Sequence, residues 1–471
     1  MTALVLDAQR QLFADTHVIG EMFAIERSVL SPERHPGNPI MSPEMPWEGG
    51  FIDPVKVLRD TDSGQFRLWY RAWTSIRPPV ERHLCYATSA DGISWERPEL
   101  GLVEFHGSRA NNLVQSRPDM YFIHDPREPD SSRRFKAVGR FDTESLCAAF
   151  SPDGLRWTEY EANPVIDKIG DAHTLLGWDE RQSAYVGYFR PYEGLDDPIR
   201  DEYPMGFRRI GRCTSTDFIH WSPMEMVLVP DAHDPVGTQF YEMYVTPYEG
   251  VYFSTVLVLH IDRGLRDYDQ PNPEGMEQTI DVQLAFSRDG IHWTRLGDRH
   301  PWLALGPSQS WEDRHVYAQP LLVLDDEIRV YYQGANVRHE IQELRLSGER
   351  VEGRWRGSRV GLARLRRDGW VVARPEPHAA EAWMTTKTLT ISGERLWVNA
   401  DASTGSLEAE ILDEGSRPLP GFERSRCVAL TDDALAAPLA WRDADIRSLG
   451  GRPVRLRFYL NGASLYSFWS S

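Results

Sequence analysis

A short motif repeats along this chain and constrains its fold more than any other feature. Four copies read SADGISW, SPDGLRW, STDFIHW and SRDGIHW, and a degenerate fifth, LRRDGW, ends at Trp370. The tryptophans recur at intervals of about 60 to 80 residues, which indicates one supersecondary unit per copy. Asp-Gly favours a tight turn, and the Ser or Thr ahead of it bonds the turn amides. The Trp would then anchor the strand that follows.

Short apolar and aromatic segments, bounded by Gly, Pro, Asp and Asn, surround each motif, as is typical of β-strands. The segment directly before each turn reads LCYATS, LCAAFS, IGRCTS, VQLAFS or VGLARL. Two more segments precede it, such as FIDPVKVLRD and FRLWYRAW in the first repeat, and we allow for a fourth strand after the Trp. Four-stranded units repeated around an axis make a β-propeller. The prediction is an all-β chain with a five-bladed propeller over residues 46–378.

Both ends of the chain lack the motif. Residues 1–45 include QLFADTHVI and FAIERSVL, and we expect this segment to close the ring or to pack on the propeller. Residues 379–471 contain alternating segments such as RLWVNADAS and PVRLRFYLN between Gly, Pro and Asp turns. This pattern predicts a small C-terminal β-sandwich.

Composition excludes several classes of partner. The 471 residues include 52 Lys and Arg against 70 Asp and Glu, so the formal net charge is −18 and nucleic acid is not an expected partner. The chain has no apolar run of transmembrane length and no secretory signal pattern, so no membrane partner is expected. Four cysteines without C-x-x-C or zinc-finger spacing favour a reducing cytoplasm. The oligomeric state stays open.

Acidic residues recur where the innermost strands of the predicted blades begin. Asp53 lies thirteen residues before Phe66, which opens the second strand of the first repeat. The same distance, with allowance for a longer hairpin in the second repeat, leads to acids in the second and third repeats. In the fourth repeat an acid opens the strand EMYVTPY, and in the fifth Glu312 and Asp313 lie just ahead of QPLLVL. Because innermost strands converge on a central channel, these acids are predicted to ring one mouth of it. The set is Asp53, Asp119, Asp171 beside His173, Glu242, and Asp313 beside His315.

A ring of carboxylates suits the hydrolysis of a glycosidic bond. One carboxylic acid protonates the leaving oxygen, and a second carboxylate attacks the sugar or activates water. A third tunes the pKa of a neighbour. The alternative is that each acid only caps a loop, and we assign that role to Asp125 in the hairpin that follows its strand. His173 and His315 are either structural or metal-ligating; we expect the former, with no metal and no obligatory cofactor.

Three arginines end the second strand of the first three repeats, at the same predicted mouth. Arg71, Arg140 and Arg190 either pair with the carboxylate ring or bind an anionic group of the substrate, such as a uronate carboxylate or a phosphate. The fifth repeat offers Asn336 at this place, and Glu48 lies just ahead of the first innermost strand. Aromatic residues nearby, among them Tyr241 and Tyr317, are candidates for stacking on sugars.

The chain resembles the five-bladed propeller glycoside hydrolases of families 32, 43, 62, 68 and 130, and its LCYATSADGISWERPELGLVEFHGSRANNLV stretch resembles family-32-like sequences. That resemblance covers the propeller and a C-terminal sandwich. It implies that Asp53 in GGFIDPV is the nucleophile or base, and that Glu242 in QFYEMYV is the acid. Asp119 in SRPDM would stand for the element that stabilises the transition state. The family-32 signature W-M-N-D-P-N-G is replaced here by WEGGFIDP, and Glu242 falls one blade late.

Three hypotheses follow. The first is a glycosidase acting on an oligosaccharide or glycoside, with Asp53, Asp119, Asp171 and Glu242 in the catalytic set. The second is a glycoside phosphorylase, in which the arginines bind phosphate. The third is a propeller that binds carbohydrate without chemistry.

Overall fold

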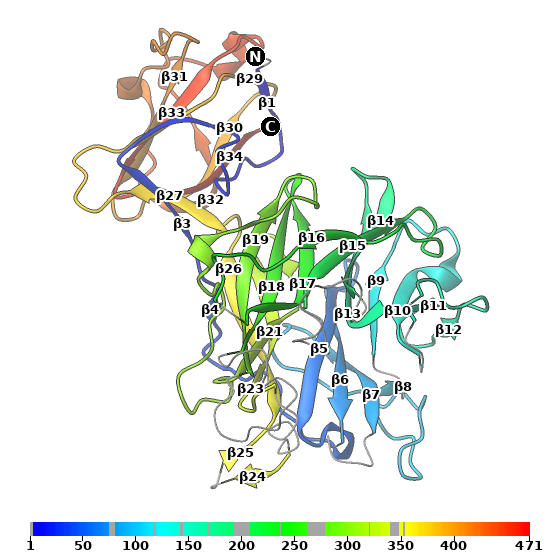
Figure 1. The fold of residues 1–471 in the computed structure, drawn as a ribbon. Helices are drawn as coiled ribbons and strands as arrows, with labels where there is room; N and C mark the ends of the chain where they lie inside the picture. The colour runs from blue at the N-terminus through cyan, green and yellow to red at the C-terminus, as the bar shows by residue number, and fades with distance from the viewer. Residues whose placement is uncertain are drawn as a thin grey trace.

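The computed structural model describes residues 3–74, 81–115, 119–141, 145–167, 169–191, 208–235, 237–261, 278–319, 321–339, 348–351 and 354–471, without the side chains of residues 171, 172 and 261. Over these ranges the chain forms β-strands and short 3-10 turns, with no α-helix (Figure 1). The prediction of an all-β chain is therefore confirmed. No helix in the described ranges has the length and hydropathy needed to span a membrane. The 3-10 turns are η1 (Pro46–Glu48), η2 (Ser131–Arg133), η4 (Gly297–Arg299), η5 (Arg424–Arg426) and η6 (Ile446–Leu449).

Three antiparallel four-stranded sheets follow one another along the chain, and we number them units 1 to 3. Each orders its strands as the chain does, so that neighbouring strands are joined by hairpins. Unit 1 holds β5 (Phe51–Arg59), β6 (Phe66–Trp73), β7 (Arg82–Ser89) and β8 (Leu113–Gln115). Unit 2 holds β9 (Met120–His124), β10 (Phe135–Gly139), β11 (Cys147–Ser151) and β12 (Thr158–Glu159). Unit 3 holds β13 (Ile169–Asp179), β14 (Ala184–Pro191), β15 (Ile210–Ser215) and β16 (Glu225–Leu228).

Units 4 and 5 share one nine-stranded sheet, since Ile280 pairs in parallel with His315. Unit 4 holds β17 (Gln239–Tyr248), β18 (Val251–Ile261), β19 (Gln278–Ser287) and β20 (Thr294–Arg295). Unit 5 holds β21 (His315–Ala318), β22 (Leu322–Val323), β23 (Glu327–Ala335) and β26 (Ser358–Arg366), with β4 (Glu33–Arg34) beside β26. Unit 4 keeps the order of the chain, whereas in unit 5 both β21 and β22 pair with β23. A small hairpin, β24 (Arg350–Val351) and β25 (Arg354–Trp355), precedes β26.

The repeated motif builds the turn after each third strand as the sequence suggests. In unit 2 the Ser151 hydroxyl accepts a hydrogen bond from Gly154 N (2.9 Å). One Asp153 oxygen accepts from Leu155 N and Arg156 N, both at 2.8 Å. Because donors and acceptors all lie within six residues, each motif folds its own turn. The same bonds from the aspartate recur at Asp91, Asp217 and Asp289.

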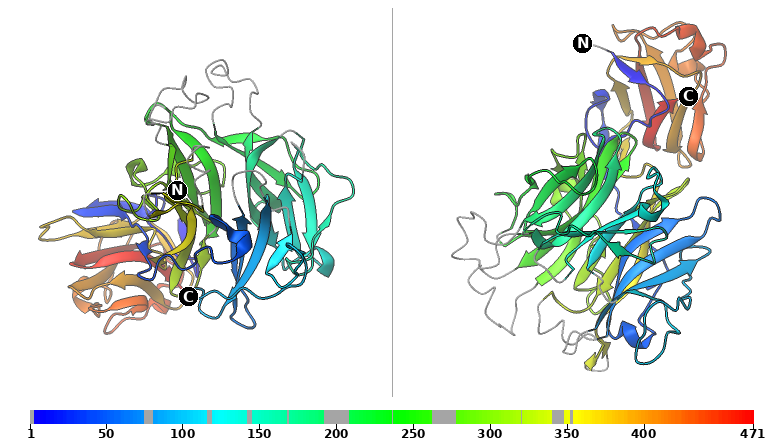
Figure 2. Two further views of the ribbon diagram at one scale, coloured as in Figure 1. Left: turned by 90° about the horizontal axis from the view of Figure 1, so that it is seen from below. Right: turned by 90° about the vertical axis from the view of Figure 1, so that its right-hand side faces the viewer.

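These turns also join neighbouring units. An aromatic side chain on the second strand of one unit donates a hydrogen bond to a carbonyl in the turn of the next unit. The bond from unit 5 reaches unit 1, so the last unit contacts the first, and Ser358 adds a second link through Ile52 N (2.9 Å). The first strands of units 1 to 4 contact one another in order, and Figure 2 shows these sheets, coloured from blue to yellow-green, gathered in one part of the molecule. The turn bonds are Trp69 Nε1 to Gly154 O (2.8 Å), Tyr188 Oη to Gly290 O (2.9 Å) and Tyr331 Oη to Gly92 O (2.9 Å).

The remaining strands form two sheets and a short parallel pair, and the N-terminal segment contributes to all of them. The orders are β2-β28-β33-β31, β3-β27-β34-β30-β32, and β1 with β29. Their bounds are β1 (Leu4–Leu6), β2 (Ile19–Phe23), β3 (Ile25–Val29), β27 (Val371–Pro375), β28 (Trp383–Thr386), β29 (Leu389–Ile391), β30 (Leu396–Asp401), β31 (Ser406–Leu412), β32 (Asp433–Leu439), β33 (Arg455–Asn461) and β34 (Ser464–Ser470).

This arrangement differs from the expected domain boundaries. Within residues 3–45, β4 and a bridge from Met41 to Val360 extend unit 5, whereas β1, β2 and β3 pair with strands from the C-terminal quarter. Strand β27 lies before the expected boundary at 378, yet it pairs with β3 and β34. The pairing partners are distant in sequence, so no local pattern marks them.

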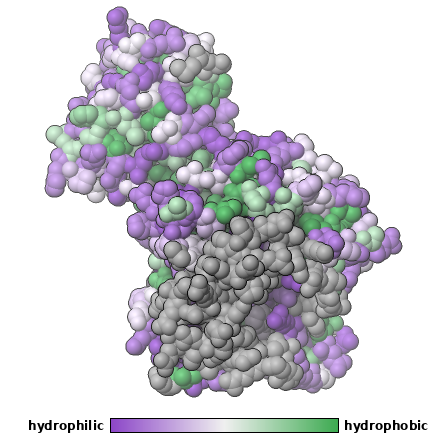
Figure 3. All heavy atoms as spheres, in the orientation of Figure 1, coloured by the Kyte–Doolittle hydropathy of each residue, from purple (hydrophilic) through white to green (hydrophobic). Residues whose placement is uncertain are grey.

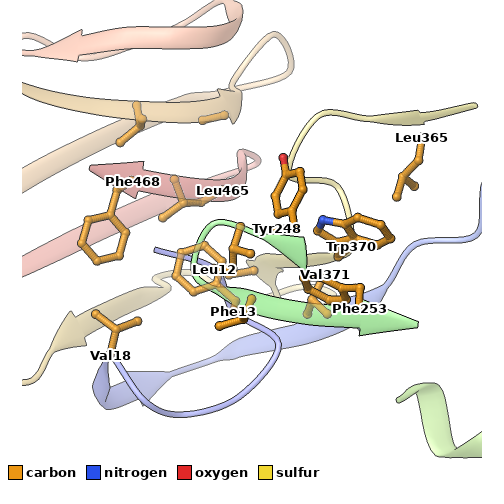
Figure 4. Packing of buried hydrophobic residues seen from close by; sticks show 14 of the residues in the cluster. Leu12, Phe13, Val18, Tyr248, Phe253, Leu365, Trp370, Val371, Leu465 and Phe468 are labelled. Carbon is orange, nitrogen blue, oxygen red and sulfur yellow. The ribbon is translucent and has the colours of Figure 1, made fainter. Parts of the chain in front are cut away.

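One hydrophobic cluster runs from unit 4 into the C-terminal sheets. Figure 4 shows Phe13 beside Phe468, with ring centroids 6.1 Å apart. Trp370 stacks on Phe253 of unit 4 at 4.2 Å. The fully buried Asp368 of the fifth motif accepts hydrogen bonds from both sides of this junction. Its donors include Tyr248 of unit 4 and Ser467 of β34 (2.6 Å). The face drawn in Figure 3 is mainly hydrophilic outside the grey atoms, with small apolar patches.

Candidate active site

Asp53 and Glu242 occupy matching places in units 1 and 4. Asp53 pairs with Arg71, five residues after the Phe66 that faces the motif serine Ser89. Glu242 pairs with Leu257, five residues after the Tyr252 that faces Ser287. Both carboxyl groups are buried, and both lie near the start of the first strand of their unit. The sequence analysis proposed both residues from their places at the predicted starts of strands.

The Asp53 carboxylate is held by side chains from two units. Arg71 Nε donates to Oδ2 at 2.9 Å, and Arg71 Nη2 contacts the same oxygen. Gln319, which follows β21 of unit 5, donates to Oδ1 at 3.2 Å. Burial raises the pKa of Asp53, and the Arg71 charge opposes that shift. The guanidinium therefore favours the ionised form of a group that burial would neutralise.

The Glu242 carboxyl group contacts two tyrosines. Tyr121 of β9 donates to Oε1 at 2.8 Å, and Tyr244 contacts Oε2. Burial raises the pKa of Glu242, and the negative charge of Asp53 raises it further. No ion pair with Glu242 is formed by the described residues, although the charge of Arg71 acts on it from a distance. Of the two carboxyl groups, that of Glu242 is therefore the better placed to hold a proton.

All five units supply a side chain to this cluster. Arg71 of unit 1 lies over the Tyr121 ring of unit 2, with Cζ 5.1 Å from the centroid. The Tyr121 ring meets His173 of unit 3 edge-on at 4.8 Å. Burial lowers the pKa of His173 to about 3, so the imidazole is neutral. Glu242 and Gln319 complete the set from units 4 and 5. First strands of every unit therefore converge on one centre, which we call the carboxylate centre.

A second group of side chains surrounds Tyr241, next to the carboxylate centre. Its ring lies 5.6 Å from Tyr317, whose pKa responds to the charges of both Asp53 and Glu242. The guanidinium carbons of Arg190 and Arg208 lie 5.2 and 5.7 Å from the Tyr241 centroid.

Two neutral imidazoles accompany these arginines. His339 Nε2 lies 3.0 Å from the Tyr241 hydroxyl, and its ring is 5.9 Å from that of His315. Burial lowers the pKa of His315 to about 4 and that of His339 well below its usual value. The Tyr241 group thus combines two cations with uncharged hydrogen-bonding rings.

Other predicted site residues lie apart from the carboxylate centre. Asp119 is 44% exposed and pairs with Arg82 at 3.3 Å. Arg140 is half-buried, and its charge acts on His173. The side chain of Asp171 falls outside the described residues. Asp125 lies in the β9–β10 hairpin, at the opposite end of its strand.

Three predicted site residues already have local partners. The Asp313 carboxylate accepts from Gln309 N at 2.7 Å. Asn336 bonds Trp355 O (2.9 Å) and Gly357 N (3.0 Å). Glu48 is fully buried, and its oxygens accept from Tyr70, Arg97 and two backbone amides. Their contacts stabilise loops and the interior of unit 1, and we leave Glu48 out of the binding set below.

Sequence reasoning missed five residues of these two groups: Tyr121, Tyr244, Gln319, Arg208 and His339. Tyr121 and Tyr244 lie two residues after Asp119 and Glu242, so strand alternation places them on the same face as those acids. The two-residue period of a β-strand was therefore the sequence signal that could have identified both tyrosines. Within the described ranges, no cluster of three or more His, Cys, Asp or Glu side chains is arranged to hold a metal ion.

No protein-family model matches the chain. One curated relative is the Mycobacterium tuberculosis protein named "Uncharacterized protein Rv1502", 27% identical over 131 residues. The match spans 27% of this chain and 40% of that protein, so it covers about two fifths of the relative's length.

Several solved structures are similar to the chain at low identity. One is described as "Glycoside hydrolase" (13% identity, TM-score 0.44, 71% of this chain and 92% of the other). Another is a thermostable family-43 glycoside hydrolase (12%, 0.43, 68% and 90%). A third is a variant fructofuranosidase from Schwanniomyces occidentalis complexed with fructosylnystose (12%, 0.42, 99% and 99%). These superpositions are loose, so the case for a function comes from the carboxylate centre itself.

Proposed function

We propose that the chain is a glycoside hydrolase whose active site is the carboxylate centre. One observation carries this proposal: two buried carboxyl groups, Asp53 and Glu242, occupy matching places in different units and act on each other electrostatically. Their surroundings differ in the way that acid and base roles need. Asp53 is paired with a guanidinium, whereas the hydrogen-bond donors to Glu242 in the described ranges are tyrosine hydroxyls.

The proposal includes the architecture that gathers these residues. Units 1 to 5 would be the blades of a five-bladed propeller, with first strands innermost and β4 closing blade five. The hydrogen bond from Tyr331 to Gly92 O supports closure, because it links the fifth unit to the first. The two C-terminal sheets would form a β-sandwich, whose core includes a contact between Phe458 of β33 and Phe468 of β34 at 5.0 Å.

In the proposed reaction, Glu242 donates its proton to the glycosidic oxygen as the bond to the anomeric carbon breaks. Asp53 either attacks that carbon or takes a proton from the attacking water. Arg71 keeps Asp53 ionised, and Tyr121 and Tyr244 fix the orientation of Glu242. The separation of the two carboxyl groups decides between retention and inversion of configuration.

The substrate would be an oligosaccharide or another glycoside. Tyr241 and Tyr317 offer ring faces beside the carboxylate centre, and Arg190 and His315 offer polar contacts around them. Asp119 and Arg140 lie further out, where we assign them contacts with the part of the substrate away from the cleaved bond. We assign Asp171 the same role from its place in β13.

The test is hydrolysis of a panel of aryl glycosides and oligosaccharides by wild-type protein and Asp53→Asn. Loss of a catalytic carboxylate should lower the rate of hydrolysis by about 10²- to 10⁴-fold. Asp60→Asn serves as a matched control, because Asp60 lies in the hairpin at the other end of the same strand. Equal activity of wild type and Asp53→Asn would remove Asp53 from the mechanism. Sugar binding without product would instead favour a binding protein.

A glycoside phosphorylase is the second candidate, favoured by the two arginines around Tyr241. A phosphorylase needs a cationic site for phosphate and one carboxylic acid, here Glu242. Cleavage would then depend on phosphate and would yield a sugar phosphate. Turnover at the same rate without phosphate, with free sugar as the product, excludes this candidate.

A further inference from the structure

A cavity lies at the end of the first strands opposite the carboxylate centre. Its volume is about 240 Å³, and its lining comes from β5, from the β9–β10 hairpin and from β13. Strands β5, β9 and β13 are the first strands of units 1, 2 and 3. The cavity therefore lies among the same strands that carry Asp53 and Tyr121 at their other ends. Lys56, three residues after Asp53, lies about 10 Å further along β5.

Lys56 is the chemically unusual residue of this cavity. It is half-buried, and no carboxylate in the described part of the chain pairs with it. Burial alone lowers the pKa of its amine to about 8. A desolvated ammonium gains more from an anionic partner than one exposed to water does.

The charged groups around Lys56 have both signs, since the Asp125 carboxylate lines the same cavity. His124 lines the cavity, and its pKa is lowered by burial and by the charges of Arg67 and Lys56. Asp125 is held by the Tyr185 hydroxyl at 2.6 Å and by Arg127 N at 3.1 Å.

The two arginines on this side have other partners. The Arg127 side chain pairs with Glu180 at 2.9 Å. Arg67 contacts the Tyr86 hydroxyl and Asp153 O, at 2.9 and 2.7 Å. Both guanidinium groups are therefore engaged elsewhere, which leaves Lys56 as the cation of the cavity lining that forms no ion pair among the described residues.

The rest of the lining consists of aliphatic side chains, Trp178 and a glycine. Leu58, Ile123 and Leu176 supply aliphatic walls, and Trp178 stacks under Arg127 at 4.1 Å. Gly177 has a φ of +105°, and an added Cβ there would point at Ile123 from 3.6 Å. The cavity is smaller than the sites of drug-sized ligands, which measure about 300 to 1,000 Å³.

We propose that this cavity is a binding site for a small oxyanion, a phosphate or a carboxylate, held by the Lys56 ammonium. The site does not depend on the proposed hydrolase activity, because it lies at the other end of the strands and uses none of the same side chains. Inorganic phosphate and acetate are the two probes, and they distinguish the two sources of an oxyanion.

The experiment compares wild type, Lys56→Met and Lys387→Met, the last being an exposed lysine of the C-terminal sheets. Thermal unfolding is followed at pH 7 as each anion is added. We expect at least one anion to raise the melting temperature of wild type and Lys387→Met in a saturable manner, and to leave Lys56→Met unchanged. The same shift in all three proteins, or no shift in any, overturns the proposal.

The pH dependence gives a second readout. The amine is charged below its pKa of about 8, so anion affinity falls as pH rises through 8. Affinity that stays constant from pH 6.5 to 9 contradicts the proposal.

Amine acylation tests the site without any substitution, which matters if Lys56→Met fails to fold. Wild-type protein is labelled at pH 8 with acetic anhydride, with and without the anion, and the labelled lysines are identified by mass spectrometry. We expect the anion to slow the labelling of Lys56 but not that of Lys387. Equal slowing at both lysines, or at neither, overturns the proposal.

Discussion

The two ends of the first strands both carry acidic residues, but backbone amides hold these residues at one end only. At the hairpin end, Asp60, Asp125 and Asp179 each accept a bond from the backbone amide two residues on, at 3.0 to 3.1 Å. Asp125 and Asp179 also accept from a tyrosine of the next unit. At the other end, Asp53 and Glu242 are held by side chains, including some from other units. A carboxylate that completes its own turn is explained by that turn. One that is assembled from distant parts of the chain needs another reason.

Exchanging one acid at each end for its amide should separate the two ends most strongly. We expect Glu242→Gln to lower turnover about 10³-fold, because an amide cannot donate the proton that the leaving group needs. Asp125→Asn should leave turnover within about threefold of wild type. Initial rates on the best glycoside of the panel measure both. Similar losses of turnover in the two variants would contradict a catalytic role for the carboxylate centre.

The same two substitutions should rank in the reverse order for stability. Asp125→Asn disturbs bonds to Tyr185 and to the turn, and we expect it to lower the free energy of unfolding by about 1 to 3 kcal/mol. Glu242→Gln removes a carboxyl group whose burial is itself unfavourable, so its effect should be smaller. Urea unfolding of both variants checks the ranking. A larger loss for Glu242→Gln would indicate a structural role for Glu242.

Removing a tyrosine hydroxyl at each end gives a subtler contrast. The Tyr121 hydrogen bond opposes the raised pKa of Glu242, so Tyr121→Phe should raise that pKa further. A general acid works while protonated, so the alkaline limb of kcat/KM should move to higher pH. Tyr185→Phe, which removes the donor to Asp125, should leave the profile in place. An unmoved limb in Tyr121→Phe would exclude Glu242 as the acid.

Asp119 should give the smallest effect at the catalytic end. Its side chain is 44% exposed and its ion pair with Arg82 is open to solvent, so Asp119→Asn should change the free energy of unfolding by less than about 1 kcal/mol. We expect turnover to fall less than about tenfold, far less than in Glu242→Gln. Kinetics and urea unfolding of the single variant are sufficient. A loss near that of Glu242→Gln would bring Asp119 into the catalytic set.

Much of the fold was predictable because its signals are local. The motif places its turn with bonds inside a few residues, and the strands before it follow from composition. Asp53 and Glu242 could be compared because each lies near the predicted start of a strand, although the hairpins that follow, Arg59 to Phe66 and Tyr248 to Val251, differ in length. Pairings between the chain ends were not predictable: nothing in FAIERSVL indicates that β3 lies beside β27.

The partners of the acids were also hard to foresee. Tyr121 and Tyr244 sit in strands where aromatic residues are normally core, so their type alone indicates packing. Gln319 of unit 5 reaches Asp53 across 266 residues of sequence, so no local pattern indicates the contact. The sequence also does not indicate that Arg97 donates a hydrogen bond to Glu48, a contact that makes Glu48 part of the interior of unit 1.

The pairing of β1, β2 and β3 with strands near the other end of the chain sets an order of events during synthesis. These strands leave the ribosome first, but the edges they join are made last. Until those edges are synthesised, β1, β2 and β3 have no pairing strands, while the sheets of the intervening units form. A chain stalled before β27 would hold its central units without the strands that tie its two ends together, and its unpaired leading strands would be open to misassociation.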